Sequence, residues 1–247
     1  MNVMPSSVSK KRKLEQIKEK NPFISSTELV YQLILDDIVQ HRLKPGQKLN
    51  QEQIAEELDM SRTPVRDALN MLERDGFLSK GAQGYTVYVI KVGDYMALLD
   101  LRIAIETLAT RLACARIRTS EIKKIAENLS RSVNILEEGA RSAWDEDFNI
   151  VDQKRCEDII HALGLMDQEF HRMIINASHN RYLIETYENL TPRIHFFRYT
   201  AMDVNCCLNM VDRHKMVYEA ITMRDENLAE QRMRTHLQLT VSRAMRY

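Results

Sequence analysis

The chain has 247 residues, enough for one large domain or two ordinary ones. Its 35 basic and 35 acidic residues cancel, so any DNA binding must come from local placement of charge. Glycine (7) and proline (5) are scarce and strand-like alternation is rare, which predicts a mostly helical protein. No apolar run is long enough for a membrane span and the N-terminus lacks a signal-peptide core, so we expect a cytoplasmic protein with no membrane partner.

The first 92 residues predict a basic arm followed by three short helices. Residues 1–22 are polar and rich in lysine, typical of a mobile arm. Ser25 or Ser26 can cap a first helix that ends near His41. Asn50 can cap a second, over 51–58. After a turn at Asp59-Met60, Ser61 caps a third helix with core spacing at Val65, Leu69 and Leu72.

A small β-hairpin is predicted after the third helix. Residues 78–80 and 85–90 are rich in strand-forming side chains, and the glycine-containing segment 81–84 separates them. Three helices followed by such a hairpin form a winged helix-turn-helix, here expected over 23–92 with its wing tip at 81–84.

The remainder, residues 93–247, predicts an all-α helical bundle. Ser120, Asn180 and Asn227 stand near expected helix starts, where they can cap the helices. The segment 140–153 has no clear period and is expected to be a loop or a broken helix. The expected helices cover 94–117, 120–139, about 154–178, 181–202, 210–224 and 226–245.

The start of the third helix has the chemistry of a DNA-reading end. The Ser61 hydroxyl and the free amides of the first turn suit a phosphate. Arg62 and Arg66 lie four residues apart and therefore share one face. Arginine can donate bidentate hydrogen bonds to guanine O6 and N7, and Thr63 can hydrogen-bond to a phosphate or a base edge. A plain structural helix pair remains the alternative from spacing alone.

Three histidines and one aspartate of the second half form a pattern. Asp167 and His171 are four residues apart on an expected helix, and His214 and His236 are nearly equidistant from the turn near Asp225. In an antiparallel helical hairpin such residues lie at the same height. Three imidazoles and a carboxylate suit a borderline divalent metal. From spacing alone, ordinary packing histidines remain the favoured interpretation.

Several motifs of the first half resemble the winged helix of the GntR family of bacterial transcription regulators. They are PGQKLN at 45–50, IAEEL at 54–58, SRTPVRDAL at 61–69 and LERDGF at 72–77. The resemblance covers about residues 26–90. It implies that Ser61, Arg62, Thr63 and Arg66 contact DNA, with Gln53 and Gly84 as weaker candidates. Asp59 stands where glycine is common, and the wing lacks the usual Arg-Gly.

The second half resembles the FCD effector domain of one large GntR subfamily. The resemblance rests on Arg102-x-x-x-Glu106, Asp167-x-x-Phe170-His171, the position of His214, and Ala229-x-x-x-Met233-x-x-His236. It implies that Asp167, His171, His214 and His236 bind a divalent ion, which could be Zn, Ni, Mn or Fe.

Arg102 is the candidate that would bind an effector carboxylate. The alternative is an i,i+4 pair with Glu106 on the helix surface. Arg193 and His195 are weaker candidates for the effector pocket.

The expected function is a ligand-responsive, sequence-specific DNA-binding regulator, with repression expected over activation. A homodimer is expected because two recognition helices must meet two half-sites of a near-palindromic operator. Such a protein would join the bacterial nucleoid when bound to DNA. The effector domain would take a metal and a small carboxylate. One alternative has a structural metal and a hydrophobic effector, and a more remote one is a metalloenzyme, although we expect no enzymatic activity.

Overall fold

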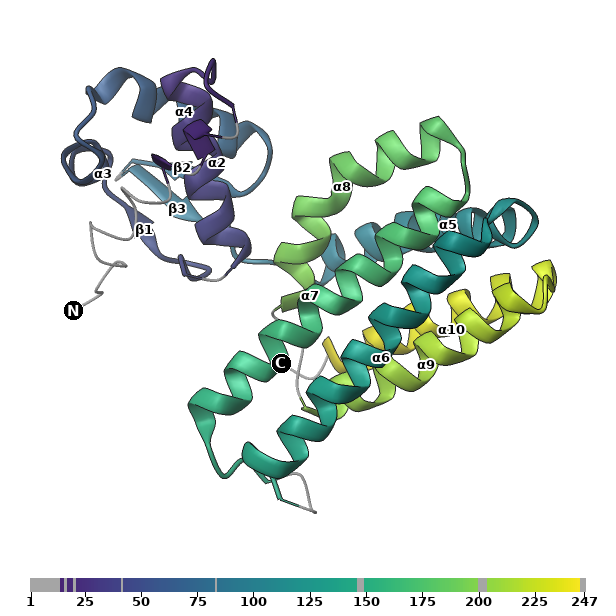
Figure 1. Cartoon of the computed structure of the whole chain (residues 1–247). Coiled ribbons are helices and arrows are strands. Elements are labelled where there is room, and N and C mark those ends of the chain that lie inside the picture. Colours follow the sequence, from purple (N-terminus) through teal and green to yellow (C-terminus); the bar gives the residue numbers. More distant parts are fainter. Residues whose placement is uncertain are drawn as a thin grey trace. The chain divides into compact units, whose positions relative to one another are not determined.

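The computed structural model describes residues 14–15, 17–19, 21–40, 42–82, 84–145, 149–199 and 204–244. The chain divides into two compact units, Met1–Lys91 and Val92–Tyr247 (Figure 1). The predicted fold class is confirmed, since a small helical unit with one sheet precedes a helical bundle. Most of the expected basic arm, His41 and Gln83 of the wing tip lie outside the described residues. No described helix is long and apolar enough to cross a bilayer.

Among the described residues from 21 onward, the first unit contains three helices and three strands. Their apolar side chains form one core. The helix over Arg62–Arg74 contributes Val65, Ala68, Leu69 and Leu72 to this core, and all four are fully buried. In chain order the elements are α2 (Ser26–Val39), β1 (Lys48–Leu49), α3 (Gln51–Leu58), α4 (Arg62–Arg74), β2 (Leu78–Gly81) and β3 (Gly84–Val87).

Side-chain caps define the starts of α2 and α3. The Ser25 hydroxyl accepts a hydrogen bond from the Glu28 amide at 3.1 Å. The Asn50 side chain accepts one from the Glu52 amide at 2.9 Å. Asp59 adopts a left-handed conformation (φ 55°) that ends α3 and starts the tight turn into α4. Aspartate and asparagine tolerate this conformation better than most residues, so Asp59 can stand where glycine is common.

The three strands form one antiparallel sheet in the order β1-β3-β2. The hairpin pairs Lys80 with Tyr85 and Gly81 with Gly84. The β1 strand pairs Leu49 with Tyr85 and was not predicted, because two residues are too few to show a period. The second hairpin strand ends at Val87, whereas the sequence suggested Ile90.

In the described part of the second unit, every named element is a long helix. These helices pack around a core in which Phe170, Ile174, Val217, Met233 and Leu237 are buried. In chain order the helices are α5 (Val92–Arg116), α6 (Thr119–Ser142), α7 (Gln153–Ala177), α8 (Arg181–Tyr199), α9 (Val204–Thr222) and α10 (Glu226–Ala244) (Figure 1).

Some helix boundaries in this unit differ from the prediction. The α9 helix begins at Val204, six residues before the expected start. The segment 140–153 is partly helical, since α6 continues to Ser142, and then an antiparallel bridge joins Trp144 to Ile150. The bridge is a tertiary contact, which local periodicity does not reveal.

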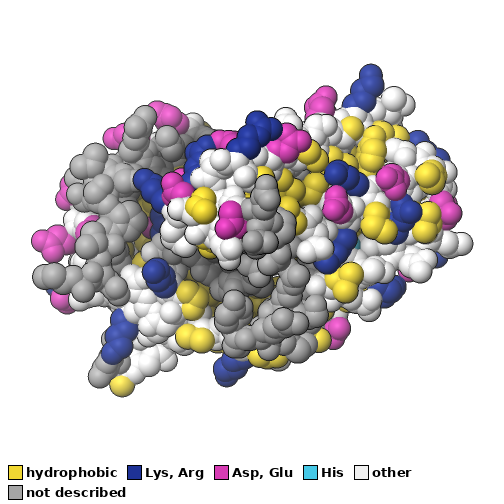
Figure 2. All heavy atoms as spheres, turned by 90° about the horizontal axis from the view of Figure 1, so that it is seen from below, with side chains coloured by type: hydrophobic (Ala, Val, Ile, Leu, Met, Phe, Trp, Pro, Cys, Tyr) yellow, Lys and Arg dark blue, Asp and Glu magenta, His cyan; other side chains and the backbone are white. Residues whose placement is uncertain are grey.

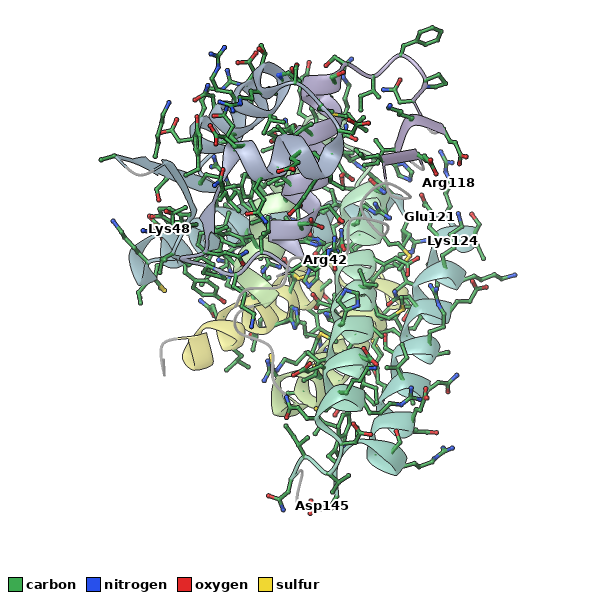
Figure 3. The ribbon with its side chains drawn as sticks, turned by 90° about the vertical axis from the view of Figure 1, so that its left-hand side faces the viewer. Arg42, Lys48, Arg118, Glu121, Lys124 and Asp145 are labelled. Carbon is green, nitrogen blue, oxygen red and sulfur yellow. The ribbon has the colours of Figure 1, made fainter. Side chains whose placement is uncertain are left out.

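Two of the three expected caps in this unit are wrong. Asn180 caps α8 as expected, since its side chain accepts hydrogen bonds from the Tyr182 and Leu183 amides. Ser120 and Asn227 instead lie inside the first turns of α6 and α10. Asp225 caps α10, with its carboxylate 2.9 Å from the Leu228 amide. Glu121 Oε2 accepts a hydrogen bond from the Arg118 amide at the start of α6 (Figure 3).

Candidate metal centre and DNA-binding surface

Helices α7, α9 and α10 bring the four candidate ligands together. Asp167 and His171 project from adjacent turns of α7, His214 from α9 and His236 from α10. Each is buried, and their potential ligand atoms all lie within 4.8 Å of one another. Because α9 and α10 are the arms of a hairpin, residues equidistant from the turn meet at one height, as the spacing predicts.

The distances inside this cluster fit a bound cation. The His171 Nε2 atom lies 3.1 Å from His236 Nε2, and Asp167 Oδ1 lies 3.5 Å from His171 Nε2 and 3.2 Å from His214 Nε2. Ligand atoms around a tetrahedral zinc ion, with bonds of about 2.0–2.1 Å, stand about 3.3 Å apart. The donor set and its spacing therefore could hold a divalent metal ion without large movement.

Apolar packing holds two of the imidazoles in place. The Phe170 ring stacks on the His214 ring with centroids 3.8 Å apart and an interplanar angle of 12°. It also meets the His171 ring edge-on at 5.6 Å. Phe170, His171 and His214 are all nearly inaccessible to solvent. Such packing restricts ring rotation, so the cluster is preorganised.

Glu106 on α5 completes the surroundings of the cluster. Its Oε2 lies 2.5 Å from His171 Nδ1, and its Oε1 accepts a hydrogen bond of 2.7 Å from Arg102 Nε. A carboxylate bound to Nδ1–H leaves Nε2 of the same ring as the ligand atom, an arrangement typical of metal sites. The i,i+4 spacing of Glu106 from Arg102 predicted a pair between these two residues, but it did not predict the contact of Glu106 with His171.

The Arg102–Glu106 pair is buried, not exposed on the helix surface as the alternative interpretation had it. The two side chains are 7% and 1% exposed. Burial by itself raises the pKa of Glu106, but Arg102 and His171 outweigh this and hold that pKa well below its usual range. Burial lowers the pKa of Arg102 while Glu106 raises it, and the net shift is upward. Both groups therefore remain charged.

Arg102 carries one buried polar group that the described residues leave unsatisfied. Among the described residues, its buried Nη2 has no hydrogen-bond partner. Burial, and after it the charge of Glu106, raises the pKa of Tyr187. Burial, Arg102 and Arg172 lower the pKa of His195 to about 4. Tyr187 and His195, both on α8, therefore lie within electrostatic reach of the Arg102–Glu106 pair.

Arg193, the other candidate for the effector pocket, is placed differently. It lies on α8 with its side chain exposed, whereas Arg102 is buried. His195, two residues further along the helix, is mostly enclosed and feels the charge of Arg102. The structure therefore brings His195 toward the Arg102–Glu106 pair and leaves Arg193 on the surface. Tyr187 was missed because tyrosines at core spacing are common in helices.

The candidate DNA-reading residues gather on the exposed start of α4. Ser61 is the residue before the helix, and its side chain makes no capping hydrogen bond. Arg62, Thr63 and Arg66 are exposed on the first two turns. The first turn contains no acidic residue, so its amides and dipole favour an anion.

Both arginines of this surface bind acidic neighbours at its edge. Arg62 Nη1 lies 2.8 Å from Glu52 Oε1, and Arg66 Nε lies 3.3 Å from Asp67 Oδ1. Exposed ion pairs of this kind contribute about 0–1 kcal/mol, so a phosphate can displace them. Among the described residues in view in Figure 2, basic, acidic and apolar side chains are interspersed.

The two weaker candidates lie outside α4. Gln53 is exposed on α3, where its amide donates to Glu57 Oε1 at 2.9 Å. Gly84 begins β3 with φ 104°, a conformation that residues with a Cβ rarely adopt. The turn geometry therefore accounts for a glycine at this position.

Two family models match the chain, one for each half. The model described as "Bacterial regulatory proteins, gntR family" matches residues 26–87, and the model of the FCD domain matches residues 97–239. The second match alone covers more than half of the chain.

Two curated relatives are transcriptional regulators, and one solved structure shares the fold. The chain is 31% identical to the Nta operon transcriptional regulator of Aminobacter aminovorans over 65% of this chain and 68% of that protein. It is 25% identical to the HTH-type transcriptional repressor RspR of Escherichia coli K12 over 88% of both chains. A putative GntR regulator from Rhodococcus sp. RHA1 shares the fold with a TM-score of 0.71 at 20% identity, covering 91% of this chain and 100% of that one.

These relatives are transcriptional regulators and not enzymes. The winged helix, the helical bundle and both family matches lead to the same assignment. The chain belongs to the GntR family of bacterial regulatory proteins, and it is a DNA-binding transcriptional regulator with a C-terminal FCD domain.

Proposed function

We propose that this regulator is a repressor whose FCD domain binds a divalent metal ion and a small carboxylate. The observation that carries the proposal is the buried chain of contacts from the Asp167–His171–His214–His236 cluster through Glu106 to Arg102. These contacts connect the candidate metal ligands to Arg102, whose buried Nη2 has no hydrogen-bond partner among the described residues. The relative named as a repressor supports repression over activation.

The cluster would supply one carboxylate and three imidazoles to the metal. This mixed nitrogen and oxygen set suits Zn, Ni, Mn or Fe, and availability in the cell contributes to which is bound. A bound ion would offset the cost of burying four polar groups and would polarise a ligand in any open position. His171, held at Nδ1 by Glu106, would present its Nε2 atom.

Arg102 would bind the effector. Its Nη2 group is buried and has no partner among the described residues, and a carboxylate can accept a hydrogen bond there while its charge is balanced. Tyr187 and His195 lie within electrostatic reach of the same pair, as their shifted pKa values indicate. An effector bound to Arg102 would also affect the metal centre, because Glu106 contacts both Arg102 and the candidate ligand His171.

The winged helix would bind a near-palindromic operator as part of a homodimer. Ser61, Arg62, Thr63 and Arg66 would face the DNA, with Arg62 and Arg66 as the candidates for base edges and phosphates. An effector can change the affinity for DNA only if it binds the DNA-competent and the DNA-incompetent arrangements of the dimer with different affinity.

The exposed face of α5 would form part of the dimer interface. Leu101 and Leu108 are 42% and 45% exposed, although they lie two turns apart on one side of the helix. Ala97 and Ala104 are exposed on the same side and allow close approach. Two such faces packed in antiparallel fashion would set Leu101 of one protomer against Leu108 of its partner.

Charges flanking this face suit a second copy of the chain. Asp100 is exposed in the N-terminal half of α5. Arg111 lies in the C-terminal half and is 52% exposed, although its Nε also lies 3.4 Å from Glu226 Oε2 of the same chain. In an antiparallel pair the acidic half of one helix meets the basic half of the other. The surface is therefore self-complementary, as a two-fold interface requires.

The dimer proposal is tested by sedimentation equilibrium. Leu101→Glu and Leu108→Glu should each shift the protein toward the monomer, because each new charge would be buried without a partner against an apolar leucine of the other protomer. Leu165→Glu is the matched control, since Leu165 is 41% exposed on α7. A dimer that survives both α5 substitutions would show that this face is not the interface.

The metal and effector are tested on the full-length protein as purified. Native mass spectrometry should show one metal ion for each chain. Small carboxylic acids should then raise the melting temperature by several degrees, because a ligand at 100 times its Kd stabilises by about 2.7 kcal/mol. The amides of the same acids should have little effect, and a chelator should abolish the response.

Arg102→Lys is the informative variant for the effector. It keeps the charge beside Glu106 but removes the planar fork that suits a carboxylate. The variant should retain metal and lose the response to carboxylates, including any release of bound DNA measured by fluorescence anisotropy. Equal stabilisation by carboxylates and amides would instead support a structural metal with a hydrophobic effector.

A further inference from the structure

Asn70 joins the recognition helix to the wing. It lies on α4 four residues after Arg66 and eight after Arg62, so the three side chains follow one stripe of the helix. The Oδ1 atom of Asn70 accepts two hydrogen bonds from the hairpin, one from the Tyr85 hydroxyl at 2.6 Å and one from Lys80 Nζ at 3.2 Å.

The hairpin itself holds Lys80 in this position. Lys80 and Tyr85 are direct partners in the β2–β3 register, and the ammonium stands over the Tyr85 ring at 5.3 Å from its centroid. Leu78, two residues before Lys80, is buried on the same face of the strand, the face that packs against α4. Two contacts, the hydrogen bond to Asn70 and the cation–π contact with Tyr85, therefore hold a side chain that is otherwise long and flexible.

The result is a third cation in line with the two arginines. Asn70 lies about 6 Å beyond Arg66 along the helix axis. Lys80 is exposed, so its ammonium is open to a partner from solvent even while it binds Asn70. An ammonium suits a phosphate oxygen as a compact point charge, and prior ordering lowers the entropy cost of binding.

We propose that Lys80 binds a DNA phosphate from the wing, and that Asn70 and Tyr85 are positioning residues for it. This proposal rests on DNA binding through α4. It places the wing's phosphate contact at Lys80 on strand β2, and not at the wing tip over 81–84. The duplex backbone would then be held from two elements, the start of α4 and the side of the hairpin. Such a contact adds affinity without reading sequence.

The test is the salt dependence of binding to a duplex selected from a random-sequence library by the full-length protein. Lys80→Ala should lower the slope of log K against log salt by about 0.9 for each protomer, or about 1.8 for a homodimer, because one phosphate contact is lost. Lys124→Ala is the matched control, since it removes the same charge from α6 in the other unit (Figure 3) and should leave the slope unchanged.

The positioning role needs a second measurement. Asn70→Ala should reduce affinity and slope in part, and the double variant Asn70→Ala/Lys80→Ala should bind no worse than Lys80→Ala alone. Residues that act as a unit give such non-additive effects, whereas two independent structural losses would add. Lys80→Arg keeps the charge and should retain the wild-type slope.

The outcomes separate this inference from the function on which it rests. Wild-type binding with a steep salt slope that Lys80→Ala leaves intact would overturn the role of Lys80 and leave DNA binding by α4 in place. Failure of the wild-type protein to bind any selected duplex at low salt would overturn both. Thermal melting of Lys80→Ala should match that of the wild-type protein.

Discussion

The two units of this regulator surround their arginines in opposite ways. On α4, Arg62 is 69% exposed and its ion pair with Glu52 is open to water. On α5, Arg102 is 7% exposed and its ion pair with Glu106 is enclosed by the helical bundle. An exposed pair breaks at little cost and leaves a cation free for DNA. A buried pair holds its geometry, because separation leaves a charge without compensation.

The largest expected effect comes from breaking the buried pair. Glu106→Gln removes the charge that balances Arg102 and should lower the free energy of unfolding of the metal-free protein by about 3–5 kcal/mol. It also weakens the support of His171 and should reduce metal affinity by about 10- to 100-fold. Urea unfolding measures the first effect and calorimetric titration with zinc the second.

Glu52→Gln is the same chemical change at the exposed pair. Because Glu52 is 66% exposed, this substitution should change stability by less than about 1 kcal/mol and leave metal affinity unaltered. Equal effects of the two glutamine variants would show that the contrast between the units has no energetic meaning.

Acidification should destabilise the folded protein through His195, which is mostly enclosed beside the buried Arg102. Its pKa is lowered from 6.5 to about 4 by burial and by Arg102 and Arg172, so the unfolded chain takes up the proton first. Stability should therefore fall as pH drops from about 6.5 to 4, by about 3 kcal/mol at most from this residue. Above pH 6.5 the residue is neutral in both states and has no such effect.

Urea unfolding at several pH values isolates this contribution. His195→Gln should lose less stability than the wild-type protein over that range. His179→Gln is the control, since His179 is 33% exposed and pairs with Glu121 at the surface. An identical acid response of wild type and His195→Gln would contradict the assignment.

The smallest expected effect on stability accompanies a large effect on DNA. Arg62→Ala should weaken operator binding by about 10- to 100-fold, as expected for loss of a base-edge or phosphate contact worth about 1–3 kcal/mol. Its melting temperature should barely change. Arg74→Ala, at the opposite end of α4 and 74% exposed, should leave DNA affinity near that of the wild-type protein. Anisotropy titrations at fixed salt compare the two.

Much of the fold follows from local patterns in the sequence. The bounds of α3 match the prediction, because Asn50 supplies a cap and Asp59 a stop within the segment itself. The cap on α8 and the hairpin turn are equally local. The short β1 strand and the bridge at Trp144 were missed, because each exists only through a distant partner.

The candidate site divides along the same line. The sequence by itself determined the stripe of Arg62 and Arg66 and the set Asp167, His171, His214 and His236, because helical periods and a resemblance in motifs identify residues one by one. Only the tertiary structure decided that Glu106 faces His171, that Arg102 is buried and Arg193 exposed, and that Lys80 meets Asn70. Local periodicity says which face of a helix is apolar. The neighbour that covers a polar group is chosen by packing between helices and strands far apart in the chain.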